Sequence, residues 1–179
     1  MFNQRPQSNE YAEYYNGYVT QVPEGDLIKV LEELNNKTVE FIKSITEEQG
    51  QFRYAPSKWS IKEVLGHIID TEMIMSYRML CIARGETVGL PGYDENDFVR
   101  NANFDRQSMS DLLERYTIVR KSTIQLLKSL SEESWLRRGV ANNYEATVRA
   151  IATIIPGHEL HHINVLEDRY IKAETFPKK

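Results

Sequence analysis

The chain has 179 residues, of which 41% are apolar and 27% are charged, and its formal net charge is −4 at pH 7. This length suits one domain with a substantial core, so we treat residues 1–179 as a single domain. The two signs of charge are interspersed, and the absence of a basic stripe leads us to exclude nucleic acid as a partner.

The same composition argues against a membrane or secreted protein. No stretch approaches the roughly 18 consecutive apolar residues of a membrane span, and the polar, tyrosine-rich residues 1–15 lack the apolar centre of a signal peptide. The single cysteine, Cys81, cannot form an internal disulfide. We therefore expect a cytoplasmic protein without a membrane partner.

The chain begins with two predicted helices. Residues 24–45 place apolar side chains three and four apart, which indicates one amphipathic helix that starts just after Pro23. The second helix begins at Ser60, where Glu63 completes a capping box. It is predicted to run to about Ala83, with Gly85 as its stop.

A polar connection of residues 85–107 then precedes two further helices. The connection can hold a turn at Pro91 and Gly92 and one short helical turn, and a loop of this length often borders a site. Residues 108–130 are again periodic, and a fourth helix is predicted from about residue 145 to residue 170, interrupted by Pro156. No run alternates with period two, so strands are not expected. The prediction is an all-α four-helix bundle.

A weak internal sequence similarity, or echo, relates the two halves of the chain. IKSITEEQ at 42–49 resembles LKSLSEES at 127–134, and each follows one long helix. The specificity is low, because Ser or Thr followed by two glutamates is a common helix start. If the echo is real, it brings His67 and the late histidines onto facing helices.

Three of the four histidines lie in the stretch GHELHHINVL, residues 157–166. At about 100° per residue, His158 and His162 are separated by roughly 40° around the helix and share the inward apolar face. His161 lies at the edge of that face, so we expect a flanking residue. Glu159 lies on the opposite edge and is less well aimed.

His67 also faces inward, among Val64 and Thr71 of the second helix. Three imidazoles from two helices match the neutral nitrogen donors that a divalent metal requires. Asp70 and Glu63 stand one turn either side of His67, and either could fix its tautomer by accepting the other ring proton. Asp70 is the preferred candidate.

Two other interpretations compete with this site. A single buried histidine is more often a core residue bonded to a carbonyl than a metal ligand, although three converging histidines favour a metal. Residues 158–162, HELHH, also satisfy the HExxH string of zinc proteases, with Glu159 as general base. An all-helical chain makes the protease interpretation weaker.

The sequence also resembles a known family. KWSIKEVLGHIIDTE at 58–72, followed by HELHHINVLEDRY at 158–170, is similar to the DinB/YfiT-like family of metal-dependent enzymes, and the likeness spans nearly the whole chain. The resemblance implies an up-down-down-up bundle and a divalent metal, nickel or zinc, held by His67, His158 and His162. It also implies a homodimer.

The chemistry of that family offers two functions, and a non-catalytic protein is a third hypothesis of a different class. The leading hypothesis is a thiol-dependent S-transferase, of the bacillithiol type, that acts on small electrophiles. The first alternative is a hydrolase that uses metal-activated water. The second is a non-catalytic dimeric bundle, which the lack of a fourth protein ligand disfavours, because structural zinc sites are usually closed.

Substrate contacts are harder to predict. Tyr11, Tyr14, Tyr15 and Tyr18 are expected to pack at the bundle end more than to bind an anion. Arg78 lies on the His67 face and could bind a carboxylate, although we expect it to reach solvent or an internal acid. Cys81 lies about four turns from His67 and receives no catalytic role.

Overall fold

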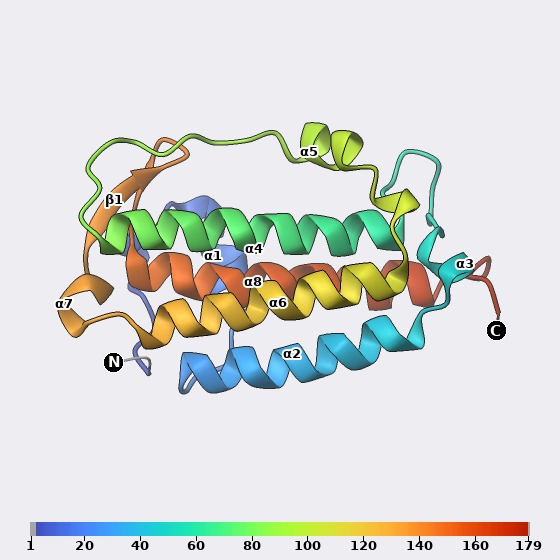
Figure 1. Ribbon diagram of the computed structural model, residues 1–179, viewed down its shortest axis with the longest axis horizontal. Helices are drawn as coiled ribbons and strands as arrows, with labels where there is room; N and C mark the ends of the chain where they lie inside the picture. The colour runs from blue at the N-terminus through green and yellow to red at the C-terminus, as the bar shows by residue number, and fades with distance from the viewer. Residues whose placement is uncertain (1–2, 179) are drawn as a thin grey trace.

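The computed structural model describes residues 3–178, and four long helices form its body. These are α2 (Leu27–Ser44), α4 (Ile61–Ala83), α6 (Met109–Lys128) and α8 (Val148–Val165). Figure 1 shows them side by side, with α2 and α8 running in one direction and α4 and α6 in the other. The predicted four-helix bundle with up-down-down-up connectivity is confirmed.

The shorter elements gather at the ends and flanks of this bundle. They are η1 (Ser8–Glu10), η2 (Glu13–Tyr15), α1 (Asn16–Val19), α3 (Glu47–Gly50), α5 (Glu95–Ala102), η3 (Phe104–Arg106), α7 (Glu132–Trp135), β1 (Arg138–Ala141), β2 (Tyr144–Thr147) and the π-helical η4 (Leu166–Ile171).

Side-chain caps fix where the long helices begin. Ser60 accepts a hydrogen bond from the backbone N–H of Glu63 while the Glu63 carboxylate accepts from the backbone N–H of Ser60, so the predicted capping box is present. Gly85, at φ 91°, follows α4 in the conformation expected of a helix stop. Thr46 and Ser131 each cap a short helix, α3 and α7, so the two echoed segments share a local structure.

The connection between α4 and α6 sets the topology. It crosses the length of the bundle and carries α5, so α6 starts at the same end as α4 and runs parallel to it (Figure 1). In the resulting ring, α4 packs against α6 and α8, and α2 packs against the same two helices. This arrangement places His67 on α4 opposite His158 and His162 on α8.

A two-stranded hairpin corrects the expectation that the chain has no strands. β1 and β2 are antiparallel, with Arg138 opposite Thr147. They are joined by Asn142 and Asn143 at φ 53° and 66°, the positive values that a tight hairpin turn requires and that asparagine tolerates. Leu90 of the long connection bonds to the backbone of Val140 and Asn142. Strands of four residues are too short to reveal a period of two.

Pro156 does not interrupt the fourth helix, contrary to expectation. α8 runs from Val148 through Val165 with Pro156 inside it. Gly157 follows, and any Cβ there would collide with the backbone carbonyl of Tyr18. The missing side chain therefore lets α1 pack directly on α8, one residue before His158.

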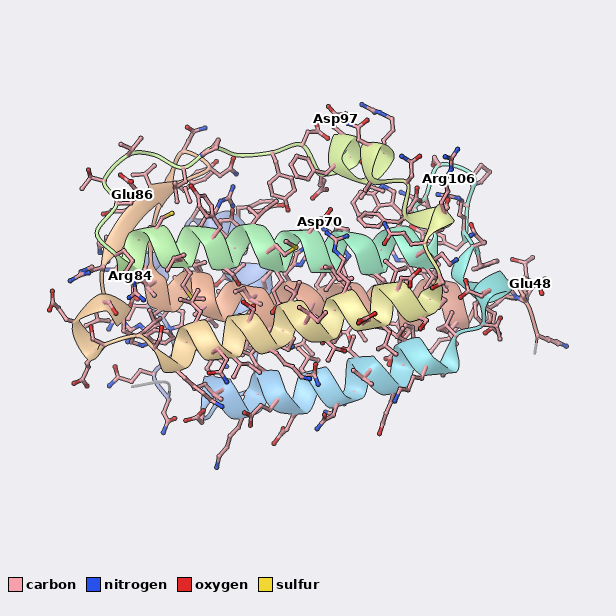
Figure 2. All side chains as sticks on the ribbon, viewed as in Figure 1. Glu48, Asp70, Arg84, Glu86, Asp97 and Arg106 are labelled. Carbon is pink, nitrogen blue, oxygen red and sulfur yellow. The ribbon has the colours of Figure 1, made fainter. Side chains whose placement is uncertain are left out.

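Most charged side chains remain on the outside, as Figure 2 shows for Glu48, Glu86 and Asp97 at the margin of the molecule. The exceptions are buried and lie between the helices; they include Glu72, Arg78, Arg120, Arg149 and Glu159. Within residues 3–178, no helix has the length and apolar character needed to cross a membrane.

Candidate metal centre

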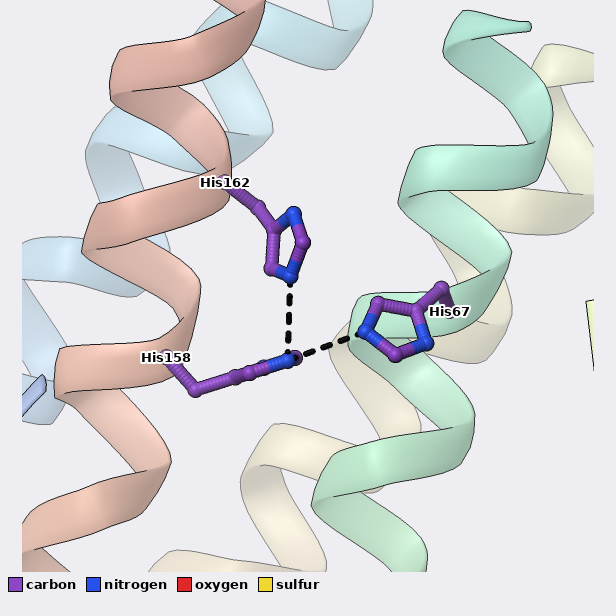
Figure 3. Close-up of side chains that lie close together, drawn as sticks. All are labelled: His67, His158 and His162. Atoms are coloured by element: carbon purple, nitrogen blue, oxygen red, sulfur yellow. Dashed lines mark hydrogen bonds between the residues drawn. The ribbon is translucent and has the colours of Figure 1, made fainter. Parts of the chain in front are cut away.

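Three histidine rings meet between α4 and α8 (Figure 3). The Nε2 atom of His158 lies 3.0 Å from Nε2 of His67 and 3.1 Å from Nε2 of His162. One ring nitrogen from each residue falls within 4.8 Å of the others. The two inward faces that periodicity predicted therefore converge on one point.

Burial keeps these imidazoles neutral. Loss of solvation lowers the pKa of His67 to about 4. It also lowers the pKa of His162, to about 3, with a further contribution from His67 and His161. His158 is buried, and desolvation followed by its histidine neighbours holds its pKa well below the ordinary value. Near pH 7 each ring thus retains a lone pair.

Hydrogen bonding among the rings cannot satisfy all three nitrogens. A neutral imidazole Nε2 carries either one proton or one lone pair, so His158 Nε2 can form one good bond with His67 or with His162, but not both. A divalent cation accepts all three lone pairs at once. The donor set therefore fits a metal with three protein ligands, which leaves coordination positions open.

Aromatic rings pack against two of the three histidines. The Trp59 ring lies 4.9 Å from His67, and the Tyr18 ring lies 5.5 Å from His158, measured between centroids. His161 stacks edge-on against Tyr18 and His162 and does not join the triad, as expected for a flanking residue.

Two cavities border the triad. One, of about 120 Å³, reaches His158 and is lined by Tyr14, Tyr15, Tyr18, Thr71, Met75, Arg78, Tyr93, Glu95, Asn142 and Ile154; we call it the tyrosine cavity. The other, of about 320 Å³, reaches His161 and His162 and is lined mainly by η4 and by the segment 54–59. A small molecule could thus approach the histidines from either side.

Glu159 faces away from this site. Its carboxylate accepts hydrogen bonds from Tyr116 (2.5 Å) and Thr38 (2.7 Å) and pairs with Arg120. The side chain is 1% exposed. Since these partners occupy both carboxylate oxygens, Glu159 has no free oxygen to act as general base, and the geometry does not support the protease interpretation.

The two carboxylates expected beside His67 have other partners. Asp70 accepts a hydrogen bond from Arg115 at 2.5 Å. Glu63 accepts from the backbone of Ser60 and pairs with Arg53. Among the hydrogen bonds within residues 3–178, neither reaches a histidine. Both residues flank the inward face, and each turns toward an arginine instead.

Three of the four N-terminal tyrosines lie at the site. Tyr14, Tyr15 and Tyr18 form a ring cluster and line the tyrosine cavity. The same three side chains therefore pack against one another and border the site. Tyr11 instead donates to Asn16. Cys81 is a free, half-buried thiol on the third turn after Thr71 and lines neither cavity.

Sequence reasoning missed several residues. Arg120 and Glu72 are buried, although the sequence analysis did not single them out. A signal existed, because Arg120 follows Tyr116 by four residues and therefore shares its inward face. Tyr93 and Asn142 come from loops whose position depends on the tertiary fold, and periodicity carries no information about them.

Two known proteins are similar to this chain. A curated protein of Oceanobacillus iheyensis named "Putative metal-dependent hydrolase OB0413" is 24% identical over 139 residues, which cover 76% of this chain and 79% of that protein. The solved structure of YfiT from Bacillus subtilis, described as "a probable metal-dependent hydrolase with an unusual four-helix bundle topology", has a TM-score of 0.73 at 20% identity. The structural match covers 92% of this chain and 90% of the YfiT chain.

The sequence pattern of the DinB superfamily matches residues 31–166, a span that contains all three histidines of the triad. That span is also most of the bundle, from within α2 to the end of α8. The chain belongs to the DinB superfamily.

Proposed function

We propose that this protein is a divalent-metal-dependent enzyme whose metal is held by His67, His158 and His162. The observation that carries the proposal is the meeting of three neutral Nε2 atoms that cannot satisfy one another by hydrogen bonding. A metal bound there supplies Lewis acidity and lowers the pKa of a bound water or thiol, which yields a nucleophile near neutral pH.

The surrounding residues have defined parts in such a site. Trp59 and Tyr18 pack on the ligand rings and hold their orientation. Tyr18 is held beside His158 because α1 packs closely on α8 at Gly157. The cavities on the two sides leave room for a reactant beside the histidines.

Hydrolysis is the reaction that the relatives support best. The curated relative and the solved relative are both described as metal-dependent hydrolases. A site with three protein ligands and open positions suits water activation.

Thiol transfer to a small electrophile is the second candidate. The tyrosine cavity and the larger cavity by His162 could each hold one reactant, which a two-substrate reaction requires and a hydrolase does not. Nickel and zinc are both compatible with three imidazoles. The homodimer, the cytoplasmic location and the exclusion of nucleic acid stay predictions.

One assay separates these candidates. Protein treated with chelator and then reloaded with nickel or zinc is offered activated esters and amides without thiol, and monochlorobimane with cysteine or glutathione. Metal-dependent turnover of the first set supports the hydrolase, and turnover that requires the thiol supports the transferase. His161→Ala is the matched control and should keep activity that His162→Ala loses. Metal binding without turnover of either set would favour the non-catalytic bundle.

A further inference from the structure

Arg78 differs from the other buried arginines. Arg78, Arg120 and Arg149 are 3%, 0% and 7% exposed. Arg120 pairs with Glu72 and Glu159, and Arg149 pairs with Glu10. Within residues 3–178, no carboxylate lies within ion-pair distance of Arg78. The expectation that Arg78 reaches solvent or an internal acid is therefore not met.

The contacts of Arg78 are neutral ones. Its Nη2 donates to the carbonyl of Pro91 at 2.7 Å, and its Nη1 makes a weak 3.7 Å contact with the sulfur of Met75. The guanidinium also lies 5.9 Å from the centre of the Tyr93 ring. A buried cation without a counter-ion is destabilising, so this side chain is costly unless an anion joins it.

The guanidinium borders the tyrosine cavity, and the cavity leads to the metal centre. On α4, Thr71, Met75 and Arg78 follow His67 on one face and line the cavity together with His158 of α8. Arg78 lies about 16 Å from His67 along the helix axis, and helical side chains lean toward the helix N-terminus, here toward the triad.

The other groups around the cavity suit a single negative charge. Burial raises the pKa of the Tyr15 and Tyr93 phenols, which therefore stay neutral. Glu95 lies exposed at the cavity, where its charge repels a dianion more strongly than a monoanion. A planar carboxylate matches the fork of a guanidinium and carries one charge, unlike a phosphate dianion.

We infer that the tyrosine cavity binds the carboxylate of a small-molecule reactant through Arg78, while the reacting end of that molecule lies at the histidine triad. The placement of the reacting end rests on the proposed function, whereas the placement of the carboxylate depends only on Arg78. The reactant is therefore an acid whose carboxylate is separated from its reacting atom by several bonds.

The test is an NMR titration with propionate, its neutral analogue propionamide, and inorganic phosphate. Each probe is added to the chelator-treated protein and to the metal-loaded protein. Arg78→Met retains most of the apolar stem and removes the charge; Arg84→Met, exposed at the end of the same helix, is the control.

Propionate is expected to bind both forms of the wild type and to bind Arg78→Met at least about tenfold more weakly. Propionamide should bind the wild type weakly, and Arg84→Met should behave as wild type. Arg78→Met should also need at least as much urea to unfold, because it removes an unpaired buried charge; a purely structural arginine would show the reverse.

Three results would overturn the inference: propionate binding that survives in Arg78→Met, phosphate or propionamide binding as tightly as propionate, or binding that needs metal and disappears in His162→Ala. The last result would make the carboxylate a metal ligand. Since the chelator-treated protein is titrated as well, failure of the metal proposal leaves the test of Arg78 intact. If Arg78→Met does not fold, Arg78→Lys replaces it, and unchanged propionate affinity there would reject the guanidinium site.

Discussion

His158 and Glu159 are neighbours in α8, yet they belong to two buried clusters of opposite character. Glu159 joins Arg120, Glu72, Tyr116 and Thr38, where opposite charges and hydroxyl donors are matched. His158 joins two imidazoles whose nitrogens compete for its single Nε2 position. One step of about 100° around the helix axis separates the two environments.

The difference distinguishes a polar cluster whose groups satisfy one another from one whose nitrogen atoms do not. In the first cluster, Arg120 reaches Glu72 through two nitrogens, at 2.9 and 2.8 Å, and also pairs with Glu159. In the second, His158 lines the same cavity as Arg78, whose contacts are with neutral groups. Substitutions in the two clusters should therefore differ in how metal changes the unfolding free energy.

The largest effect is expected from breaking the matched cluster. Arg120→Met leaves Glu72 and Glu159 buried without a counter-ion, and such a loss costs about 3–5 kcal/mol of unfolding free energy. Urea unfolding measures it, with or without metal. The triple variant with Glu72→Gln and Glu159→Gln should recover much of the loss. A decrease below about 1 kcal/mol would show that the cluster is not a matched unit.

In the triad, stability should instead depend on metal. At a free metal concentration of about 100 times Kd, binding to the folded state adds about 2.7 kcal/mol to the unfolding free energy. His162→Gln should abolish this gain, and His161→Gln, which lies outside the triad, should keep it. An equal gain in His162→Gln and wild type would place the metal elsewhere.

Acid should weaken the metal-free protein through the same residues. The pKa of His67 falls from 6.5 to about 4 on burial, so between these values the unfolded chain binds more protons than the folded one. Stability is retained above about pH 6.5 and declines as the pH falls toward 4, by up to about 1.4 kcal/mol per pH unit for this histidine. His67→Gln should show a shallower decline in urea titrations. Parallel pH profiles would refute the neutral buried imidazole.

The smallest effect is expected at an exposed ion pair. Arg100 and Asp97 pair on α5 with side chains 69% and 55% exposed. Asp97→Asn should change the unfolding free energy by less than about 0.5 kcal/mol, because solvent screens such pairs. A change of more than about 1 kcal/mol would mean that burial does not explain why the buried clusters contribute more to stability than exposed ion pairs do.

Much of this structure could be predicted from the sequence. Helical periodicity and the Ser60 cap located the four helices, and the same arithmetic selected His67, His158 and His162. Local rules succeed there because each residue faces inward by virtue of its own helix alone.

The remainder depends on contacts between distant segments. Asp70 turned to Arg115 of another helix, which no spacing within α4 reveals. The turn at Asn142 and Asn143 was overlooked because each flanking strand has four residues. Tyr93 reaches Thr71 from the long connection, at 2.8 Å, only because that connection runs back along α4.

The most direct test of the central claim is elemental analysis of untagged protein purified without chelator and then dialysed against nickel or zinc. We predict about one ion per chain in the wild type and in His161→Ala, as one three-histidine site requires. The His67→Ala and His162→Ala variants, if folded, should each bind no ion at this site. A wild type that holds no metal after reloading, or variants that retain the full amount, would contradict the assignment of the triad as a metal centre.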